Sequence, residues 1–100
     1  MMTIMTETTL KDGMEPQWDE AYHRRAEAVA DHEGWVSLQL LIPLDAPNKR
    51  VVLGTWRTRA DWEAWHSSDT FLETRAQMDA AEEAEDREER WYEVVTRENG

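Results

Sequence analysis

Residues 54–71 read GTWRTRADWEAWHSSDTF and hold the clearest local signals in the chain. Thr58 is a residue type that caps helix N-termini, and Asp61 follows it by three positions. Ring side chains then recur at the i, i+3 and i+4 spacing of one helical face, namely Trp62, Trp65 and His66. Ser68 is a second capping residue type, so the sequence predicts a helix that is interrupted there and begins again before Phe71.

Two apolar runs precede this helix. Residues 50–56, RVVLGTW, predict a strand that Trp56 closes. Residues 35–42, WVSLQLLI, predict an earlier strand, and residues 43–48 between the two runs are rich in turn-forming types. The two runs therefore predict a β-hairpin.

The first third of the chain predicts a strand and then a helix. Residues 2–10 alternate, with one face made of Ile4, Thr6, Thr8 and Leu10. A turn at Gly13 leads to Pro16, which is tolerated in the first turn of a helix. Core-type residues then recur at helical spacing, namely Trp18, Tyr22, Ala26 and Val29. We expect this helix to end at Gly34.

The last quarter of the chain is strongly acidic before a final apolar run. Residues 79–90 hold seven acidic and two basic residues, which predicts a solvated helix end or loop. Residues 91–96, WYEVVT, predict the last strand. The element order is then β-α-β-β-α-β over a single domain, residues 1–100. This order is typical of the α+β ferredoxin-like fold, an antiparallel four-stranded sheet with two helices on one face.

The predicted strand 35–42 is apolar on both faces. Alternation places Val36, Leu38, Leu40 and Ile42 on one face and Trp35 and Leu41 on the other. An antiparallel sheet with one wet face is expected to alternate cleanly between apolar and polar residues. A second copy of the chain is the simplest cover for the other face, so the sequence predicts a homodimer.

Composition excludes several functional classes. The chain has 100 residues, a formal net charge of −11, no cysteine and six tryptophans. The acidic balance argues against nucleic-acid and anionic-membrane surfaces, which require clustered Lys and Arg. Without cysteine there is no disulfide, thiolate catalysis or iron–sulfur cluster. We found no signal peptide, membrane span or glycine-rich phosphate loop, so we expect a cytoplasmic protein.

At this point the chain resembles the antibiotic biosynthesis monooxygenase family. The resemblance rests on residues 54–71, in which Trp56 closes the third strand, Trp62 and Trp65 anchor the helix, and Phe71 follows. It implies a dimeric α+β barrel. Family members without haem oxidise phenol- or quinol-type substrates with O₂ and no cofactor. The resemblance therefore implies a monooxygenase acting on a small aromatic substrate.

The closest local resemblance is to the small haem-degrading monooxygenases of that family. Trp65 falls at the position of their helix Trp, whereas Thr6 stands where they have an Asn and Arg75 where they have the axial His. A guanidinium stays protonated and cannot ligate iron, so this haem chemistry is in doubt. Haem binding through another ligand, with His66 as the candidate, remains an alternative.

Five residues are the candidates for the site. His66 and Arg75 are predicted to be catalytic, His66 as a base and Arg75 as the countercharge of a substrate anion. Thr6, Trp65 and Trp56 are predicted to bind substrate. The competing interpretations are that Trp65 is simply core, that His66 lies at the edge of the site or in water, and that Arg75 pairs with Asp79 at the surface.

Other residues attract structural interpretations. The remaining large aromatic side chains are assigned to the core, namely Trp18, Trp62 and Phe71. Consecutive residues make a poor ligand set, so Asp31, His32 and Glu33 predict no metal site. A cofactor-free isomerase or a non-catalytic small-molecule-binding dimer remain alternatives to the oxygenase.

Overall fold

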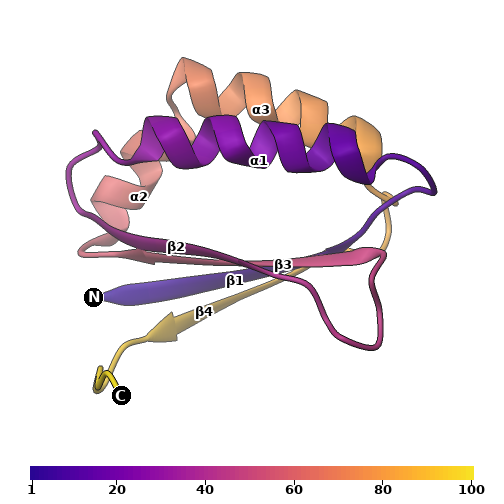
Figure 1. Cartoon of the computed structure of the whole chain (residues 1–100). Coiled ribbons are helices and arrows are strands. Elements are labelled where there is room, and N and C mark those ends of the chain that lie inside the picture. The colour runs from indigo at the N-terminus through magenta and orange to yellow at the C-terminus, as the bar shows by residue number, and fades with distance from the viewer.

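The protein is described by a computed structural model that covers residues 1–100. Its elements follow one another as β1 (Met2–Thr9), α1 (Glu15–Val29), β2 (Trp35–Leu41), β3 (Lys49–Trp56), α2 (Arg59–His66), α3 (Asp69–Ala81) and β4 (Glu88–Glu93). Figure 1 shows the strands as one layer and all three helices on one face of that layer. None of the helices is long and apolar enough to cross a membrane.

The four strands form one antiparallel sheet in the order β2-β3-β1-β4. The β1 strand therefore lies inside the sheet, between β3 and β4. The element order and the single helical face confirm the ferredoxin-like α+β fold. The strand register decides which side chains meet beneath the helices. Ile4 pairs with Gly54, and Thr6 pairs with Val52.

Two serine or threonine caps divide the second helical region, as predicted. The Thr58 hydroxyl accepts a hydrogen bond from the Asp61 backbone N–H at 3.1 Å. The Ser68 hydroxyl accepts one from the Phe71 N–H at 3.3 Å. Each cap satisfies a donor that the first turn of a helix leaves free. The chain can therefore end α2 at His66 and start α3 three residues later in a new direction.

The end of α1 differs from its predicted position. The helix ends at Val29, well before Gly34. Gly34 instead has φ of +82° in the turn that leads into β2, and a Cβ there would collide with the Asp61 side chain. The glycine is thus required by a left-handed backbone and a close approach to α2, and it marks the start of β2.

The last strand begins and ends three residues earlier than predicted. It spans Glu88–Glu93 in place of residues 91–96. Its partner β1 sets these limits, because Glu93 pairs with Met2 and Glu88 pairs with Glu7. The Val94 N–H still donates to the Met1 carbonyl oxygen at 3.0 Å, but the pairing stops there because β1 begins at Met2, so hydrophobicity alone misplaced the strand.

A bulge in β2 overturns the predicted face of Trp35. The register with β3 shifts between Trp35 and Ser37, so Val36 is an additional residue on this strand. Strict alternation placed Trp35 and Leu38 on opposite faces. In the structure both side chains line the cavity beneath the helices, because one inserted residue inverts the alternation.

The core consists of two apolar clusters between the sheet and the helices. One contains Leu10, Trp18, Ala21, Tyr22, Met78 and Ala81. The other contains Val29, Trp56, Trp65 and Phe71. Beside the first cluster, the buried Arg50 of β3 makes an ion pair with Asp19 of α1 at 2.9 Å, which joins the sheet to the helix. The two clusters border a cavity that both help to line.

The other face of the sheet carries no helix (Figure 1). Its residues are mixed in character. Met5 pairs with Leu53 across β1 and β3, and the neighbouring Thr3 and Thr55 hydroxyls are hydrogen-bonded at 2.8 Å. Exposed apolar side chains at the two outer strands are Leu41 and Tyr92. The uncovered face is therefore only partly apolar. The alternation in strand 35–42 had predicted a more apolar face.

Candidate active site

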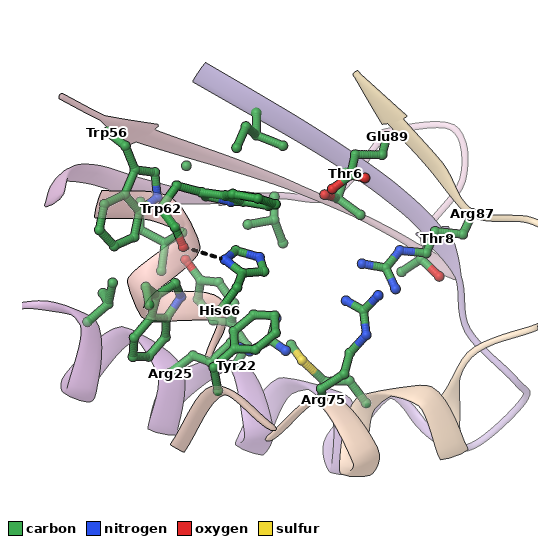
Figure 2. Close-up of a pocket in the computed structure, with 18 of the residues that line it drawn as sticks. Thr6, Thr8, Tyr22, Arg25, Trp56, Trp62, His66, Arg75, Arg87 and Glu89 are labelled. Carbon is green, nitrogen blue, oxygen red and sulfur yellow. Dashed lines mark hydrogen bonds between the residues drawn. The ribbon is translucent and has the colours of Figure 1, made fainter. Parts of the chain in front are cut away.

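A cavity of about 90 Å³ lies between the sheet and the helices. Residues from all four strands and all three helices line it, and Figure 2 shows them converging. All five predicted site residues are among the lining, namely Thr6, Trp56, Trp65, His66 and Arg75. The structure thus brings together residues that are up to 69 positions apart in sequence (6 to 75), while their individual roles stay predictions.

One end of the cavity is aromatic and is built mainly by α2 and the start of α3. Trp65 is only 5% exposed and packs edge to face on Phe71, with ring centroids 5.8 Å apart. His32 contacts the Trp65 ring as well, at 4.7 Å. Trp56 of β3 is 3% exposed in the same cluster. Trp65 and Trp56 are therefore both core residues and walls of the cavity, so the two interpretations of Trp65 are not exclusive.

His66 lies between two rings of the cavity wall, and not in water. Its ring centroid is 3.8 Å from that of Trp62 and 4.0 Å from that of Phe71. Its Nδ1 lies 3.0 Å from the Trp62 carbonyl oxygen, the hydrogen bond drawn in Figure 2. Because a carbonyl only accepts, Nδ1 must carry the hydrogen. The lone pair of the neutral ring is then on Nε2.

The surroundings keep His66 neutral. Burial lowers its pKa from 6.5 to about 4, against the hydrogen bond to Trp62, which raises it. The positive charges of Arg25, Arg75 and Arg87 lower the pKa further. A protonated imidazole is disfavoured both by lost hydration and by like charge. At neutral pH the ring is therefore a hydrogen-bond acceptor through Nε2.

Trp62 packs against the core cluster of Trp65 and Phe71, as assigned, and is also a wall of the cavity. The side chain is partly exposed and lies against Trp91 of β4, with ring centroids 4.5 Å apart at 70°. The Arg59 guanidinium stacks over the Trp91 ring, 4.8 Å from its centroid. Trp62 and Trp91 therefore close the gap between α2 and the β4 edge of the sheet. Helical spacing correctly grouped Trp62 with Trp65 but could not distinguish wall from core.

The opposite end of the cavity is charged. In Figure 2 the guanidinium groups of Arg75, from α3, and Arg87, from the segment before β4, point toward one another. Both also approach Asp79, whose carboxylate is 3.3 Å from Arg75 Nε and 3.9 Å from Arg87 Nη1. The predicted surface pair of Arg75 with Asp79 is thus present, and it does not remove Arg75 from the cavity.

Arg87 lies in the segment that was predicted to be solvated, which is wrong for this side chain. Only 27% of it is exposed. Burial lowers its pKa, and the charge of Arg75 adds to this, while Glu82, Glu89 and Asp79 oppose the shift. In the sequence Arg87 is one of two arginines in an acidic run, and no local pattern marks the inward one. Only the pairing of β4 with β1 turns it toward the cavity.

Arg25 is a third arginine of the site that sequence reasoning missed. Its guanidinium stacks 4.2 Å from the Phe71 centroid, and its Nε donates to the Thr74 hydroxyl at 2.8 Å. Its buried Nη2 has no hydrogen-bond partner, and it forms no ion pair. Burial, and then the charges of Arg75 and Arg87, lower its pKa to about 10. A signal was available, because Arg25 falls on the helical stripe of Tyr22 and Val29.

The sheet supplies the polar floor of the cavity. The Thr8 hydroxyl donates to Glu82 at 2.9 Å, and Trp18 Nε1 donates to the other oxygen of that carboxylate at 2.9 Å. Thr6, one step along β1, makes no side-chain hydrogen bond within the protein, although Glu89 lies opposite it in the register. The Thr6 hydroxyl is therefore free to bond a ligand, as the prediction requires.

The residues of the site do not fit haem or a metal ion. No group of three or more His, Asp or Glu side chains is placed to hold a metal. Arg75, which the resemblance puts where haem-degrading relatives have their axial His, cannot ligate iron. The geometry suits a small planar molecule with an anionic or hydrogen-bonding group.

Known proteins share this architecture. The family model described as antibiotic biosynthesis monooxygenase matches residues 1–77. A 42.8 kDa protein in the whiE locus of Streptomyces coelicolor is 36% identical over 63 residues, which cover 63% of this chain and 16% of the relative. The chain therefore spans only a small part of the length of that curated relative.

Solved structures agree in fold at low sequence identity. A protein from Nitrosomonas europaea superimposes with a TM-score of 0.87 at 21% identity, covering 96% of this chain and 100% of that one. SnoaB, described as a cofactor-independent oxygenase from Streptomyces nogalater, superimposes with a TM-score of 0.80 at 19% identity, covering 98% and 94%. The family match extends over most of the sheet and all three helix starts. This chain is therefore a member of the antibiotic biosynthesis monooxygenase family.

Proposed function

We propose that the protein is a cofactor-independent monooxygenase that oxidises a small phenol- or quinol-type substrate with O₂. The observation that carries this proposal is His66, a neutral imidazole with a free Nε2 lone pair on the wall of an aromatic cavity. Family membership and the likeness to SnoaB support the reaction class. The substrate follows from the chemistry of the lining.

The proposed reaction begins with proton transfer from a phenolic hydroxyl to His66 Nε2. A base with a pKa of about 4 is weak against a phenol, whose ordinary pKa is about 10. The transfer therefore depends on stabilisation of the phenolate, and we assign this role to the combined positive charge of Arg25, Arg75 and Arg87, which also lowers the pKa of His66. A histidine that gains a proton here also loses it readily, which returns it to its starting state.

The electron-rich anion then reduces O₂ without help from a metal or flavin. For a substrate carbon that carries two hydrogens, as in an anthrone, the products are the corresponding ketone and one water. One oxygen atom of O₂ enters the new carbonyl, the other leaves in the water, and the substrate supplies all the electrons. The protein needs only to orient the ring, exclude water and stabilise the anion.

The remaining candidates have binding roles in this proposal. Trp65 and Trp56 hold a planar ring by contact with its faces and edges. The unpaired Thr6 hydroxyl donates to an oxygen of the substrate or to the reduced oxygen that forms beside it. Each of these residues lies within the cavity lining, which is the position that such a role requires.

We also propose that the uncovered sheet face meets a second copy of the chain. Met5, Val51 and Leu53 on this face are partly buried already, and the outer strands add the exposed Leu41 and Tyr92. A twofold contact would bury the patch of both copies at once. Sedimentation equilibrium at micromolar concentration is expected to give twice the 11.8 kDa chain mass, and a purely monomeric species would contradict the dimer.

Oxygen consumption with a panel of hydroquinones and anthrones tests the reaction. We expect an enzyme rate well above the uncatalysed one, and His66→Gln is expected to lower kcat by about 10²–10⁴-fold, the usual contribution of a general base. His23→Gln is the matched control, because His23 is exposed on α1 and outside the cavity lining. If His66→Gln keeps the full rate, His66 is not the base. If no substrate raises O₂ uptake, the oxygenase proposal fails.

A further inference from the structure

Three arginines meet around one cavity in a chain whose net charge is −11. They come from three separate segments, with Arg25 on α1, Arg75 on α3 and Arg87 before β4. The chain has only 11 Lys and Arg residues in all, so three of them at one cavity are a marked local concentration of positive charge. Like charges in a partly desolvated space repel, and an anion between them reduces that repulsion.

The protein's own carboxylates do not satisfy the three guanidinium groups. Arg75 and Arg87 share the single carboxylate of Asp79, which is half exposed and more than 3.5 Å from Arg87. Arg25 forms no ion pair, and its Nη2 is buried without an acceptor. Glu82 lies nearby, but its two oxygens accept from Thr8 and Trp18. Donor capacity is therefore left over at this end of the cavity.

The field at the aromatic end is also positive. All three arginines lower the pKa of His66, and no carboxylate is among the groups that shift it. Glu89 lines the cavity on the sheet side but is exposed on β4. A ligand anion near Arg75 and Arg87 would face two guanidinium groups, with Glu82 and Glu89 as the opposing charges of the lining.

We propose that the substrate carries a carboxylate in addition to its oxidisable ring, and that Arg75 and Arg87 bind this carboxylate while Arg25 adds charge from behind Phe71. This inference rests on the proposed function for the ring and on the arginine geometry for the carboxylate. The fork of a guanidinium matches the two oxygens of a carboxylate, and charge-assisted hydrogen bonds are about twice as strong as neutral ones. The carboxylate then fixes which part of the ring faces His66.

Anaerobic calorimetry with two matched ligands tests the inference without any turnover. Gentisate and its methyl ester have the same hydroquinone ring and similar size but differ in charge. We expect gentisate to bind about tenfold more tightly or better, because a charged, partly buried contact is replaced by a neutral one. A hydroxynaphthoate and its methyl ester provide the same comparison for a two-ring substrate.

Variants assign the preference to the arginines. In the Arg75→Gln/Arg87→Gln double variant the preference for the acid over the ester is expected to be largely lost. Arg57→Gln removes one positive charge from an exposed site outside the cavity lining and is expected to keep the preference. Circular dichroism checks that each variant is folded.

The outcomes separate this inference from the proposed reaction. Equal affinity of wild type for acid and ester, a preference that survives in the double variant, or binding of neither pair would overturn the carboxylate site. Tight, arginine-dependent binding of the acid without O₂ uptake on admitting air would support the carboxylate site and contradict the oxygenase. O₂ uptake at the same kcat/KM with acid and ester would support the oxygenase and contradict the carboxylate site.

Discussion

The two ends of the cavity are made of different residues and are held by different forces. The aromatic end, formed by Trp56, Trp65 and Phe71, is part of a buried core cluster. The charged end, formed by Arg75 and Arg87, is partly exposed and has one shared carboxylate as its countercharge. Side chains at the first end stabilise the fold as well as the site, whereas those at the second end contribute little to the fold.

His66 lies where the two ends meet. Its ring packs between Trp62 and Phe71, while the arginines of the charged end act on its charge. Burial by one end and positive charge from the other shift its pKa in the same direction. Variants at the two ends, and at His66 between them, are therefore expected to change the free energy of unfolding by different amounts.

The largest effect is expected for Trp65→Ala. Trp65 is 5% exposed in the core cluster, so its truncation is expected to lower the free energy of unfolding by about 3–5 kcal/mol. Arg75→Gln is the matched variant at the charged end and is expected to cost less than about 1 kcal/mol, because its pair with Asp79 is partly exposed. Urea denaturation of both variants measures this. Similar losses would show that the two ends are not energetically distinct.

A smaller effect is expected from the titration of His66. Between its ordinary pKa of 6.5 and the lowered value of about 4, the unfolded chain binds a proton that the folded chain does not. The stability contributed by the neutral ring is therefore complete above about pH 6.5 and is lost as the pH falls toward 4. Because the ring is partly exposed, we expect this loss to be about 1–2 kcal/mol after solvent screening.

The difference between wild type and His66→Gln isolates this contribution. Other titrating groups act on both proteins, so their effects cancel when unfolding free energies are subtracted at about pH 7 and about pH 4.5. Wild type is expected to lose more stability than the variant on acidification. A difference that stays constant with pH would mean that the His66 pKa is close to its ordinary value, and that the two ends do not act on it as described.

The smallest effect is expected for Ser68→Ala. The Ser68 hydroxyl caps α3 by accepting from the Phe71 N–H, which fixes the ring that contacts both His66 and Arg25. Loss of a serine cap is expected to cost about 1 kcal/mol. Ser67→Ala, at the exposed neighbour, is expected to change stability by less than about 0.5 kcal/mol. Thermal unfolding compares them, and equal shifts would indicate that the cap does not position the aromatic end.

Sequence reasoning predicted the aromatic end better than the charged end. Trp56, Trp65 and His66 were expected at the site, and all three line the cavity. They share one local segment, and the cavity role of Trp65 was expected mainly on resemblance to the family, while helical spacing alone left His66 at the edge of the site or in water. Arg75 was expected there on the same resemblance and on its distance of ten residues from Trp65. Arg25 and Arg87 were missed, because an arginine in a charged segment carries no local sign of the direction in which it points.

The sequence by itself determined the order of elements, the break between α2 and α3, and the strand faces of β1. These depend on contacts between residues a few positions apart, such as caps and alternation. The tertiary structure alone decided the bulge that turns Trp35 inward, the limits of β4 and the inward direction of Arg87. These depend on the register between strands that are distant in sequence. A shift of one residue in register reverses every side chain on a strand, and no single segment encodes that choice.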